Sequence, residues 1–231
     1  MRIFPLYLVS TPIGNLGDLP LRAVEVLSSV DLILAEDTRR ARVLLGAKGI
    51  SAPVRSYHDH NKERVTPAVV EMLREGKRVA LIADAGTPAV SDPGYYLVRR
   101  LIEEGIEFTA VPGPSAILTA LVLSGLPTDR FTFFGYMPRK KGERERVIEE
   151  AGSNRGTGIF FESPYRLIKT LETFERILSG RELVVARELT KLHEEIVRGD
   201  AAQLLEHFRE KGVKGECVLL VRGRGRRSGT P

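Results

Sequence analysis

The sequence contains a single cysteine, Cys217, and no tryptophan. One cysteine cannot form a disulfide within the chain, and it excludes a metal site built from several cysteines. No apolar run approaches the roughly 18 residues that a membrane-spanning helix needs. The N-terminal segment also lacks the small-residue cleavage site of a signal peptide. We therefore expect a cytoplasmic protein.

Several common enzyme motifs are missing as well. No G-x-G-x-x-G joins a strand to a helix, and G-x-x-x-x-G-K-[ST] and H-E-x-x-H are absent. These absences argue against a Rossmann dinucleotide site, a P-loop and a zinc protease. The GRGRRSG stretch at 223–229 is followed by no helical pattern. His58 and His60 are two residues apart with no apparent third ligand, so we expect no metal site.

The first half of the chain alternates short apolar strands with amphipathic helices. This order predicts a parallel sheet covered on both faces, with functional loops at the carboxyl ends of its strands. The expected strands lie within 7–10, 31–37, 53–57, 78–84 and 108–113. The expected helices lie within 21–30, 38–49, 62–76 and 95–105.

The second half has shorter spacings, which indicate a mixed sheet. Strands are expected at 131–136, 158–164, 182–190 and 216–223, and helices at 142–152, 165–180 and 201–212. The fold class is therefore α/β with two domains. We place an N-terminal parallel-sheet domain at 1–113, carrying the cofactor edge and substrate cleft, and a C-terminal mixed-sheet domain at 114–231, ending in a basic Arg/Gly tail.

Three expected strands each end in a loop rich in proline and glycine: STPIGNLGDLP at 10–20, DAGTPAVSDPG at 84–94 and VPGPSA at 111–116. In a parallel sheet these loops share one edge, which indicates a binding cleft. Capping explains part of them. Asp92 before Pro93, and Asp18 with Pro20 in the first turn, have the pattern of helix starts.

Seven segments occur in an order that resembles a known family: VSTPIGNLGD, AEDTR, SYHDHN, DAGTPAVSDPG, VPGPSA, FFESPYRL and VARELTK. They are similar to the tetrapyrrole-methylase superfamily over nearly the whole chain. Within it they resemble the bacterial methyltransferases that act on the ribose 2′-oxygen of a cytidine in the decoding region of small-subunit (16S) rRNA. DAGTP and VPGPSA mark the superfamily, whereas STPIGNLGD, EDTR and ESPYRL mark the subfamily.

The resemblance implies a homodimeric, two-domain methyltransferase that folds S-adenosylmethionine into a cleft between its domains. In the N-terminal half, it implies cofactor contacts at Pro12, Ile13, Gly14, Asp84, Ala85, Gly86, Thr87, Pro88, Val90, Ser91 and Ser115. In the C-terminal half, it implies contacts at Ala116, Phe134, Phe161 and Glu162. It also implies that the C-terminal domain closes over the cofactor through segments near 133–136, 161–162 and 215–216.

Methyl transfer to a ribose hydroxyl needs alignment of oxygen, methyl carbon and sulfur, and a base could remove the proton late in the reaction. The candidate bases are Glu36 and Asp37 in AEDTR, His58 and His60 in SYHDHN, and Glu188 and Lys191 in RELTK. We take His60, Asp37 and Lys191 as the catalytic candidates, with His60 first. Asp37 could equally cap a helix that begins at Thr38.

The net charge is +5 and the pI is near 9.4, which is compatible with an RNA partner. Basic residues can neutralise phosphates without reading sequence. We expect RNA contacts from Arg39, Arg40, Arg139, Lys140, Lys141, Arg224, Arg226 and Arg227. The mixed charges of 143–146 are expected to form a solvated helix face.

Two other functions compete with rRNA methylation. The first is a methyltransferase that acts on a tetrapyrrole precursor or on a modified protein residue. The basic charge does not exclude it, because a polyanionic tetrapyrrole would also attract basic residues. The second is a ribosome-assembly factor that binds RNA without catalysis. The intact DAGTP and VPGPSA loops argue against it, because a binding protein needs no cofactor cleft.

Overall fold

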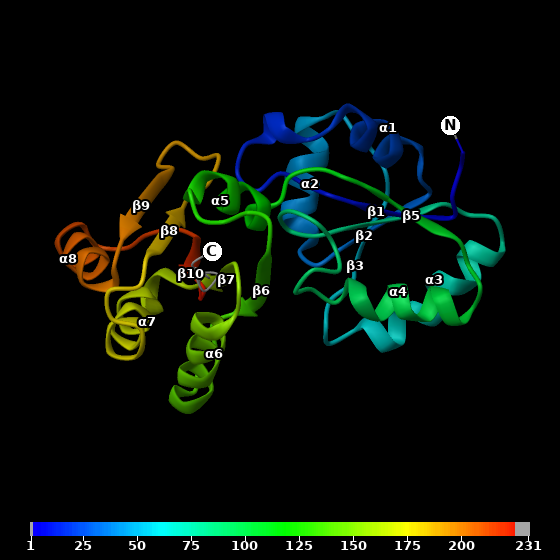
Figure 1. The fold of residues 1–231 in the computed structure, drawn as a ribbon. Helices are drawn as coiled ribbons and strands as arrows, with labels where there is room; N and C mark the ends of the chain where they lie inside the picture. The colour runs from blue at the N-terminus through cyan, green and yellow to red at the C-terminus, as the bar shows by residue number, and fades with distance from the viewer. Residues whose placement is uncertain (1, 225–231) are drawn as a thin grey trace. The chain divides into compact units, whose positions relative to one another are not determined.

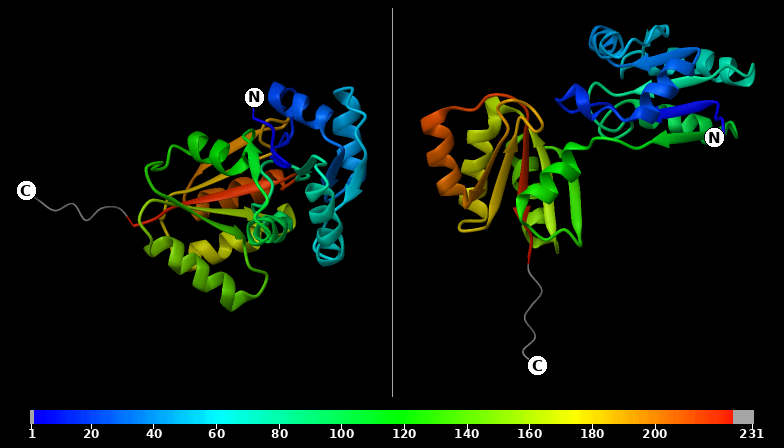
Figure 2. Two further views of the ribbon diagram at one scale, coloured as in Figure 1. Left: turned by 90° about the vertical axis from the view of Figure 1, so that its right-hand side faces the viewer. Right: turned by 90° about the horizontal axis from the view of Figure 1, so that it is seen from above.

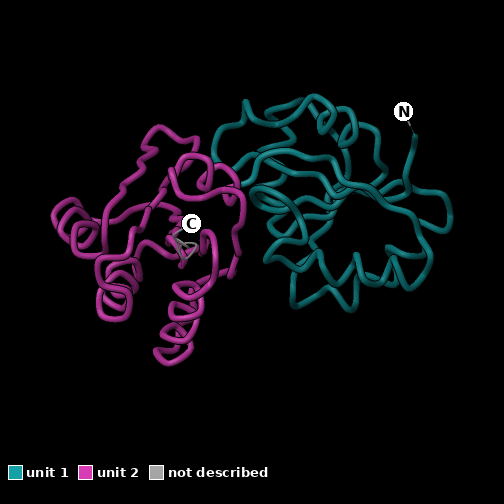
Figure 3. Tube along the Cα trace, viewed as in Figure 1, with its two compact units in different colours: residues 1–115 teal, residues 116–231 magenta. Residues whose placement is uncertain are grey.

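The computed structural model describes residues 2–224, which fold as two compact units divided after Ser115, called unit 1 and unit 2 (Figure 3). The domains expected from the sequence, 1–113 and 114–231, divide the chain two residues earlier. Over the described residues, no helix is long and apolar enough to cross a membrane.

Unit 1 contains a five-stranded sheet with strand order β3-β2-β4-β1-β5, and all its pairings are parallel, as expected (Figure 1). The strands are β1 (Leu6–Val9), β2 (Leu32–Ala35), β3 (Val54–Ser56), β4 (Val79–Ile82) and β5 (Phe108–Val111). Every residue of β2 and β4 is buried, because helices cover both faces of the sheet.

Two helices cover each face of this sheet. One core contains α1 (Leu21–Ser29) and α2 (Thr38–Ala47), and the core on the opposite face contains α3 (Lys62–Arg74) and α4 (Gly94–Glu103) (Figure 1). Strands β1 and β4 are neighbours, yet α1 and α4, which follow them, pack on opposite faces. The carboxyl ends of β1 and β4 therefore form a topological switch point, where open α/β sheets bind their ligands.

The helix starts of unit 1 agree only in part with the sequence. Asp37 caps α2, one of the two roles that the sequence left open, because its side chain accepts a hydrogen bond from the Arg39 amide. The prediction for Asp18 is wrong. A 3₁₀ helix, η1 (Leu16–Asp18), intervenes with Asn15 as its cap, and Pro20 occupies the position before α1.

Unit 2 contains a mixed five-stranded sheet, with strand order β6-β7-β10-β8-β9. Its strands are β6 (Phe131–Tyr136), β7 (Thr157–Glu162), β8 (Leu183–Arg187), β9 (Glu195–Gly199) and β10 (Cys217–Arg222). Among the strands described in this unit, only β6 and β7 pair in parallel, and β10 runs through the middle of the sheet (Figure 2). The sequence did not predict β9, because this edge strand is partly exposed and carries charged residues.

The helices of unit 2 are α5 (Ala116–Ser124), α6 (Lys141–Ser153), α7 (Pro164–Ile177) and α8 (Ala201–Lys211). Helices α6, α7 and α8 share one core with the sheet, whereas α5 packs against β8, β9 and β10. The predicted solvated face at 143–146 is wrong at Arg144. This side chain is buried, and its guanidinium donates to the Thr173 hydroxyl and the Arg139 carbonyl.

Candidate active site

The three loops rich in proline and glycine follow β4, β1 and β5, which are neighbours in the sheet. Backbone hydrogen bonds join them. Thr11 and Gly86 exchange two bonds, of 2.9 and 3.0 Å, and the Ser10 amide donates to the Val111 carbonyl at 3.2 Å. We call residues 10–20, 84–93 and 112–115 the edge loops. The expectation that they share one sheet edge is confirmed.

The loop at 84–93 is held in a strained backbone conformation. Gly86, Ala89 and Ser91 have φ angles of 78°, 67° and 62°, and the last two carry the steric cost of the left-handed region. The Asp92 carboxylate accepts hydrogen bonds from the Ala89 and Gly94 amides, at 2.7 and 2.8 Å. Burial raises the pKa of Asp92, although these two bonds oppose the shift. Strain of this kind is typical of ligand-binding loops.

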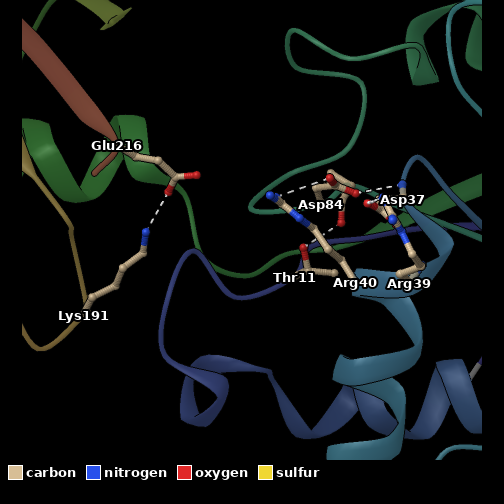
Figure 4. Close-up of polar contacts among 8 residues, drawn as sticks. Thr11, Asp37, Arg39, Arg40, Asp84, Lys191 and Glu216 are labelled. Atoms are coloured by element: carbon tan, nitrogen blue, oxygen red, sulfur yellow. Dashed lines mark hydrogen bonds and ion pairs between the residues drawn. The ribbon is translucent and has the colours of Figure 1, made fainter. Parts of the chain in front are cut away.

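Asp84 connects the same loop to the start of α2. Its Oδ1 accepts a hydrogen bond from the Asp37 amide at 3.0 Å, and its Oδ2 lies 3.5 Å from the Arg40 guanidinium (Figure 4). On the other side, the Thr11 hydroxyl donates to the Ala83 carbonyl at 3.1 Å. These bonds fix the positions of the ends of β1, β2 and β4 relative to one another.

The predicted cofactor residues of unit 1 divide into two sets by exposure. The buried set, which forms the base of the edge loops, is Pro12, Ile13, Gly86 and Pro88. The exposed set, which forms their surface, is Gly14, Ala85, Thr87, Val90 and Ser91, with Asp84 and Ser115 partly buried. The structure therefore brings this part of the prediction together on one edge. Their contact with a cofactor stays a prediction.

The two carboxylates that follow β2 have opposite environments. A side-chain hydrogen bond from Arg39, together with the Arg39 amide, lowers the pKa of Asp37 (Figure 4). Partial burial, followed by the charges of Asp84 and Asp92, raises the pKa of Glu36. Sequence reasoning could not separate the two, because its only signal was that Asp37 occupies a cap position.

The histidines lie between β3 and α3. His60 is exposed, and its ring centroid is 6.0 Å from that of His58. The His58 amide donates to the Asn61 side chain at 2.8 Å, and among the described residues the His58 Nδ1 is buried without a hydrogen-bond partner. Over residues 2–224, no group of three or more potential ligands is arranged to hold a metal ion.

In unit 2, the predicted cofactor residues are packed into the domain itself. Phe134 stacks on Phe160 with ring centroids 4.8 Å apart, and Phe161 lies edge-on to Phe133 at 4.9 Å. The buried Glu162 carboxylate accepts hydrogen bonds from the Ser163 amide, the Thr170 hydroxyl and the Arg166 guanidinium. These contacts give the residues a structural role. Their cofactor role, and that of Ala116 at the start of α5, stays a prediction.

Lys191 lies in the turn after β8. Its ammonium donates to Glu188 at 2.8 Å and to Glu216 at 3.0 Å, the second pair being drawn in Figure 4. Partial burial opposes the charge, but the bonds to the two carboxylates outweigh it and raise the pKa of Lys191. The amine therefore stays protonated, which is the wrong state for a proton acceptor.

The predicted RNA-binding residues that the structure describes all lie at the surface. Arg39 and Arg40 are ion-paired with Asp37 and Asp84, and Lys140 pairs with Glu143 at 3.2 Å. Lys141, Arg139 and Arg224 are also exposed. Arg226 and Arg227 lie outside the described residues.

The single cysteine of the chain, Cys217, is buried, and burial raises the pKa of its thiol to about 12.

Comparison with known proteins assigns this architecture. The family model of tetrapyrrole (corrin/porphyrin) methylases matches residues 5–205. The chain belongs to this family. Among solved structures, a cobalt precorrin-4 methyltransferase of cobalamin biosynthesis superposes with a TM-score of 0.69 and 19% identity, and covers 94% of both chains. The methyltransferase CobJ gives a TM-score of 0.70 at 19% identity and covers 96% of this chain and 95% of its own. At this identity, the two structures show the tetrapyrrole-methylase fold alone.

Curated members of the tetrapyrrole-methylase family are much more similar in sequence. A protein of Halalkalibacterium halodurans named ribosomal RNA small subunit methyltransferase I is 47% identical over 95% of this chain and 76% of its own length. A protein of Thermotoga maritima with the same name is 44% identical over 95% of this chain and 98% of its own. The resemblance inferred from the motifs is thus confirmed, and so is the expected two-domain α/β fold.

Proposed function

We propose that this protein is a methyltransferase that transfers a methyl group from S-adenosylmethionine to the ribose 2′-oxygen of a cytidine in the decoding region of small-subunit (16S) rRNA. The observation that carries the proposal is the 44–47% identity to rRNA small subunit methyltransferases I over 95% of the chain. The switch point between β1 and β4 supports it, because such a point is a ligand site in open α/β sheets.

The edge loops fit the proposed cofactor. Gly86 has the positive φ that favours glycine, and a Cβ atom there would lie 3.5 Å from Ile13 and 3.7 Å from the Pro114 carbonyl. Loops from three strands are therefore packed closely around this glycine, and the surfaces of Ala85, Thr87 and Val90 remain exposed. We propose that these surfaces, with Gly14 and Ser91, hold S-adenosylmethionine.

When bound, S-adenosylmethionine supplies a methyl group on a positively charged sulfur, so the reaction needs neither a metal ion nor a covalent enzyme intermediate. What the protein must provide is position. The hydrogen bonds between Thr11 and Gly86, and from Asp37 to Asp84, fix the loops before any ligand arrives. A site that is already ordered loses less entropy when the reactants are aligned, and alignment supplies much of the rate.

RNA contact is proposed for the exposed basic residues. The side chains of Arg39 and Arg40 lie at the start of α2, next to the Asp84 end of the edge loops. Arg139, Lys140 and Lys141 precede and begin α6. These residues would neutralise phosphates and position the RNA, whereas base recognition would need other contacts. We further propose that the protein acts as a homodimer in the cytoplasm.

The direct test incubates the protein with labelled S-adenosylmethionine and small ribosomal subunits that lack this modification. Label is expected on one ribose of the decoding-region RNA. Label on a base, or no transfer to any rRNA, would overturn the proposal. Free rRNA in a parallel incubation shows whether the assembled subunit is required.

Calorimetric titration with S-adenosylmethionine separates the alternatives. Binding without transfer to subunits would favour another substrate, such as a tetrapyrrole precursor or a modified protein residue. Absence of cofactor binding, together with retained RNA binding, would favour an assembly factor. Sedimentation of the purified protein tests the homodimer, for which we expect twice the chain mass of 25.6 kDa.

A further inference from the structure

Glu36 lies at the carboxyl edge of the unit 1 sheet, after β2, the strand next to β4. It follows Ala35, the last residue of β2, which pairs with Ile82 of β4 on one side and with Ser56 of β3 on the other. The next residue positions of those strands lead into the 84–93 edge loop and into the segment with His58. Glu36 therefore stands beside the switch point, and its side chain is exposed.

The carboxylates around Glu36 are all engaged in structural contacts. Asp84 accepts from the Asp37 amide and pairs with Arg40, whereas Asp37 accepts from Arg39. Asp92 accepts from the Ala89 and Gly94 amides, and Asp59 pairs with Lys62 at 2.7 Å. Within residues 2–224, the Glu36 carboxylate has neither a hydrogen bond nor an ion pair. An exposed carboxylate that makes no hydrogen bond or ion pair, next to the proposed ligand site, is free to contact a substrate.

We propose that Glu36 is the general base that accepts the proton of the hydroxyl group being methylated. The inference rests on the proposed function, since it requires a hydroxyl nucleophile. The hydroxyl oxygen forms a bond to the methyl carbon, and the carbon–sulfur bond breaks with its electron pair on the departing neutral sulfur. The hydroxyl proton passes to a Glu36 oxygen. The sulfonium charge and the carboxylate charge disappear together, so charge balances.

The electrostatic surroundings of Glu36 suit a base that must hold a proton briefly. Partial burial is the main cause that raises its pKa, and the charges of Asp84, Asp92 and Asp59 add to the shift, whereas His58 opposes it. The charged and titratable groups on the surrounding segments are Asp37, Arg39 and Arg40 at α2, Asp84 and Asp92 after β4, and His58, Asp59, His60 and Lys62 after β3. A higher pKa strengthens a carboxylate as a proton acceptor.

Two of the other candidate bases are less suitable, because their charge state or hydrogen bonds oppose proton acceptance. Asp37 is a weakened proton acceptor, because Arg39 lowers its pKa and its oxygen caps α2. Lys191 is held as an ammonium between two carboxylates. His60 is exposed at the same edge and is the principal rival.

The experiment compares wild type with Glu36→Gln in single-turnover methyl transfer to unmodified small subunits at saturating cofactor. We expect the substitution to lower the rate of transfer about 100-fold or more, the usual contribution of a positioned base. Calorimetric affinity for S-adenosylmethionine and the thermal midpoint should stay at wild-type values, because the substituted carboxylate bonds nothing in the fold. Glu36→Asp should recover part of the rate.

The pH profile identifies the group that titrates. The wild-type rate should rise with pH through one inflection above the ordinary range of a glutamate, because only the carboxylate form accepts a proton, and Glu36→Gln should lose that inflection. Asp59→Asn removes a negative charge that raises the pKa of Glu36, so it should move the inflection to lower pH with the plateau rate unchanged. His60→Ala tests the rival base and should keep the inflection that Glu36→Gln loses.

The outcomes separate this inference from the proposed function. A wild-type protein that labels no rRNA overturns the proposed function, and the inference with it. If wild type is active but Glu36→Gln transfers at the wild-type rate, or is slow and keeps the inflection, Glu36 is not the base. Loss of the inflection in His60→Ala would assign the role to that histidine instead.

Discussion

The two units of this protein are both α/β, but their strands run in different directions. In unit 1 all five strands run in parallel, so the loops that follow them gather at one edge. In unit 2 the partners of β10 and β8 are antiparallel, so the loops leave the sheet at both edges. A parallel sheet concentrates functional loops, whereas a mixed sheet disperses them.

The polar groups of the two units differ in the same way. Unit 2 buries two such side chains: Glu162 joins β7 to α7, and Arg144 joins α6 to α7. At the edge of unit 1, Asp84 and Asp92 accept hydrogen bonds from loop amides. Substitutions in unit 2 should therefore reduce stability first, and substitutions at the edge of unit 1 should reduce activity first.

The largest loss of stability is expected from Gly156→Ala in unit 2. Gly156 has a φ of 92°, and an added Cβ would lie 2.0 Å from the Arg130 carbonyl oxygen, a backbone atom. Because backbone must move, we expect a loss of at least about 3 kcal/mol in denaturant unfolding. The control is Gly180→Ala, with a φ of 68° and no atom within 4 Å, which should cost only about 1 kcal/mol. Equal losses for the two variants would contradict the steric argument.

A smaller loss is expected from Glu162→Ala. This substitution leaves the Ser163 amide, the Thr170 hydroxyl and Arg166 without their buried acceptor. We expect about 2 kcal/mol less free energy of unfolding. Glu182→Ala removes the exposed pair with Arg222 and should change stability by no more than about 0.5 kcal/mol. If cofactor affinity fell while stability did not, Glu162 would belong to the binding site rather than to the fold.

At the edge of unit 1, Asp84→Ala should affect binding more than folding. It leaves the Asp37 amide unpaired at a partly buried site, which should cost about 1 kcal/mol of stability. We expect calorimetry to show about tenfold or greater loss of S-adenosylmethionine affinity, since the loop loses its hydrogen bond to the Asp37 amide and its ion pair with Arg40. Asp84→Asn, which keeps an oxygen acceptor, should retain most of that affinity. Tight binding by the alanine variant would show that these two contacts are dispensable.

The smallest effect on the protein itself is expected from the double substitution Arg139→Ala and Lys140→Ala. Both side chains are exposed, so folding and cofactor affinity should not change. RNA affinity should fall, and its dependence on salt should weaken by about 0.7 for each phosphate that the protein no longer neutralises. The matched control, Arg209→Ala with Lys211→Ala on α8, should leave the salt dependence as in wild type. An unchanged salt slope in the first variant would exclude these residues from the RNA-binding surface.

The strands and the buried residues were predicted from sequence more accurately in unit 1 than in unit 2. All five strands of unit 1 were predicted, and β2 and β4 most clearly, because strands buried on both faces are apolar throughout. In unit 2, β9 was missed and Arg144 was assigned to solvent, because an edge strand and a buried arginine look like surface in sequence. The prediction that Asp18 caps α1 was wrong for a local reason. Asn15 caps the 3₁₀ helix η1 instead, and Asp18 is the last residue of that helix.

The sequence by itself determined the family, the two-domain α/β class and the edge loops, because these depend on local apolar periodicity and on the backbone demands of proline and glycine. Only the tertiary structure decided the strand order that makes β1 and β4 neighbours and the opposite helix positions that create the switch point. It also decided which of the two acidic residues after β2 has no hydrogen bond or ion pair within the described residues. Adjacent in sequence, Glu36 and Asp37 differ because their hydrogen-bond partners and neighbouring charges come from other strands and loops.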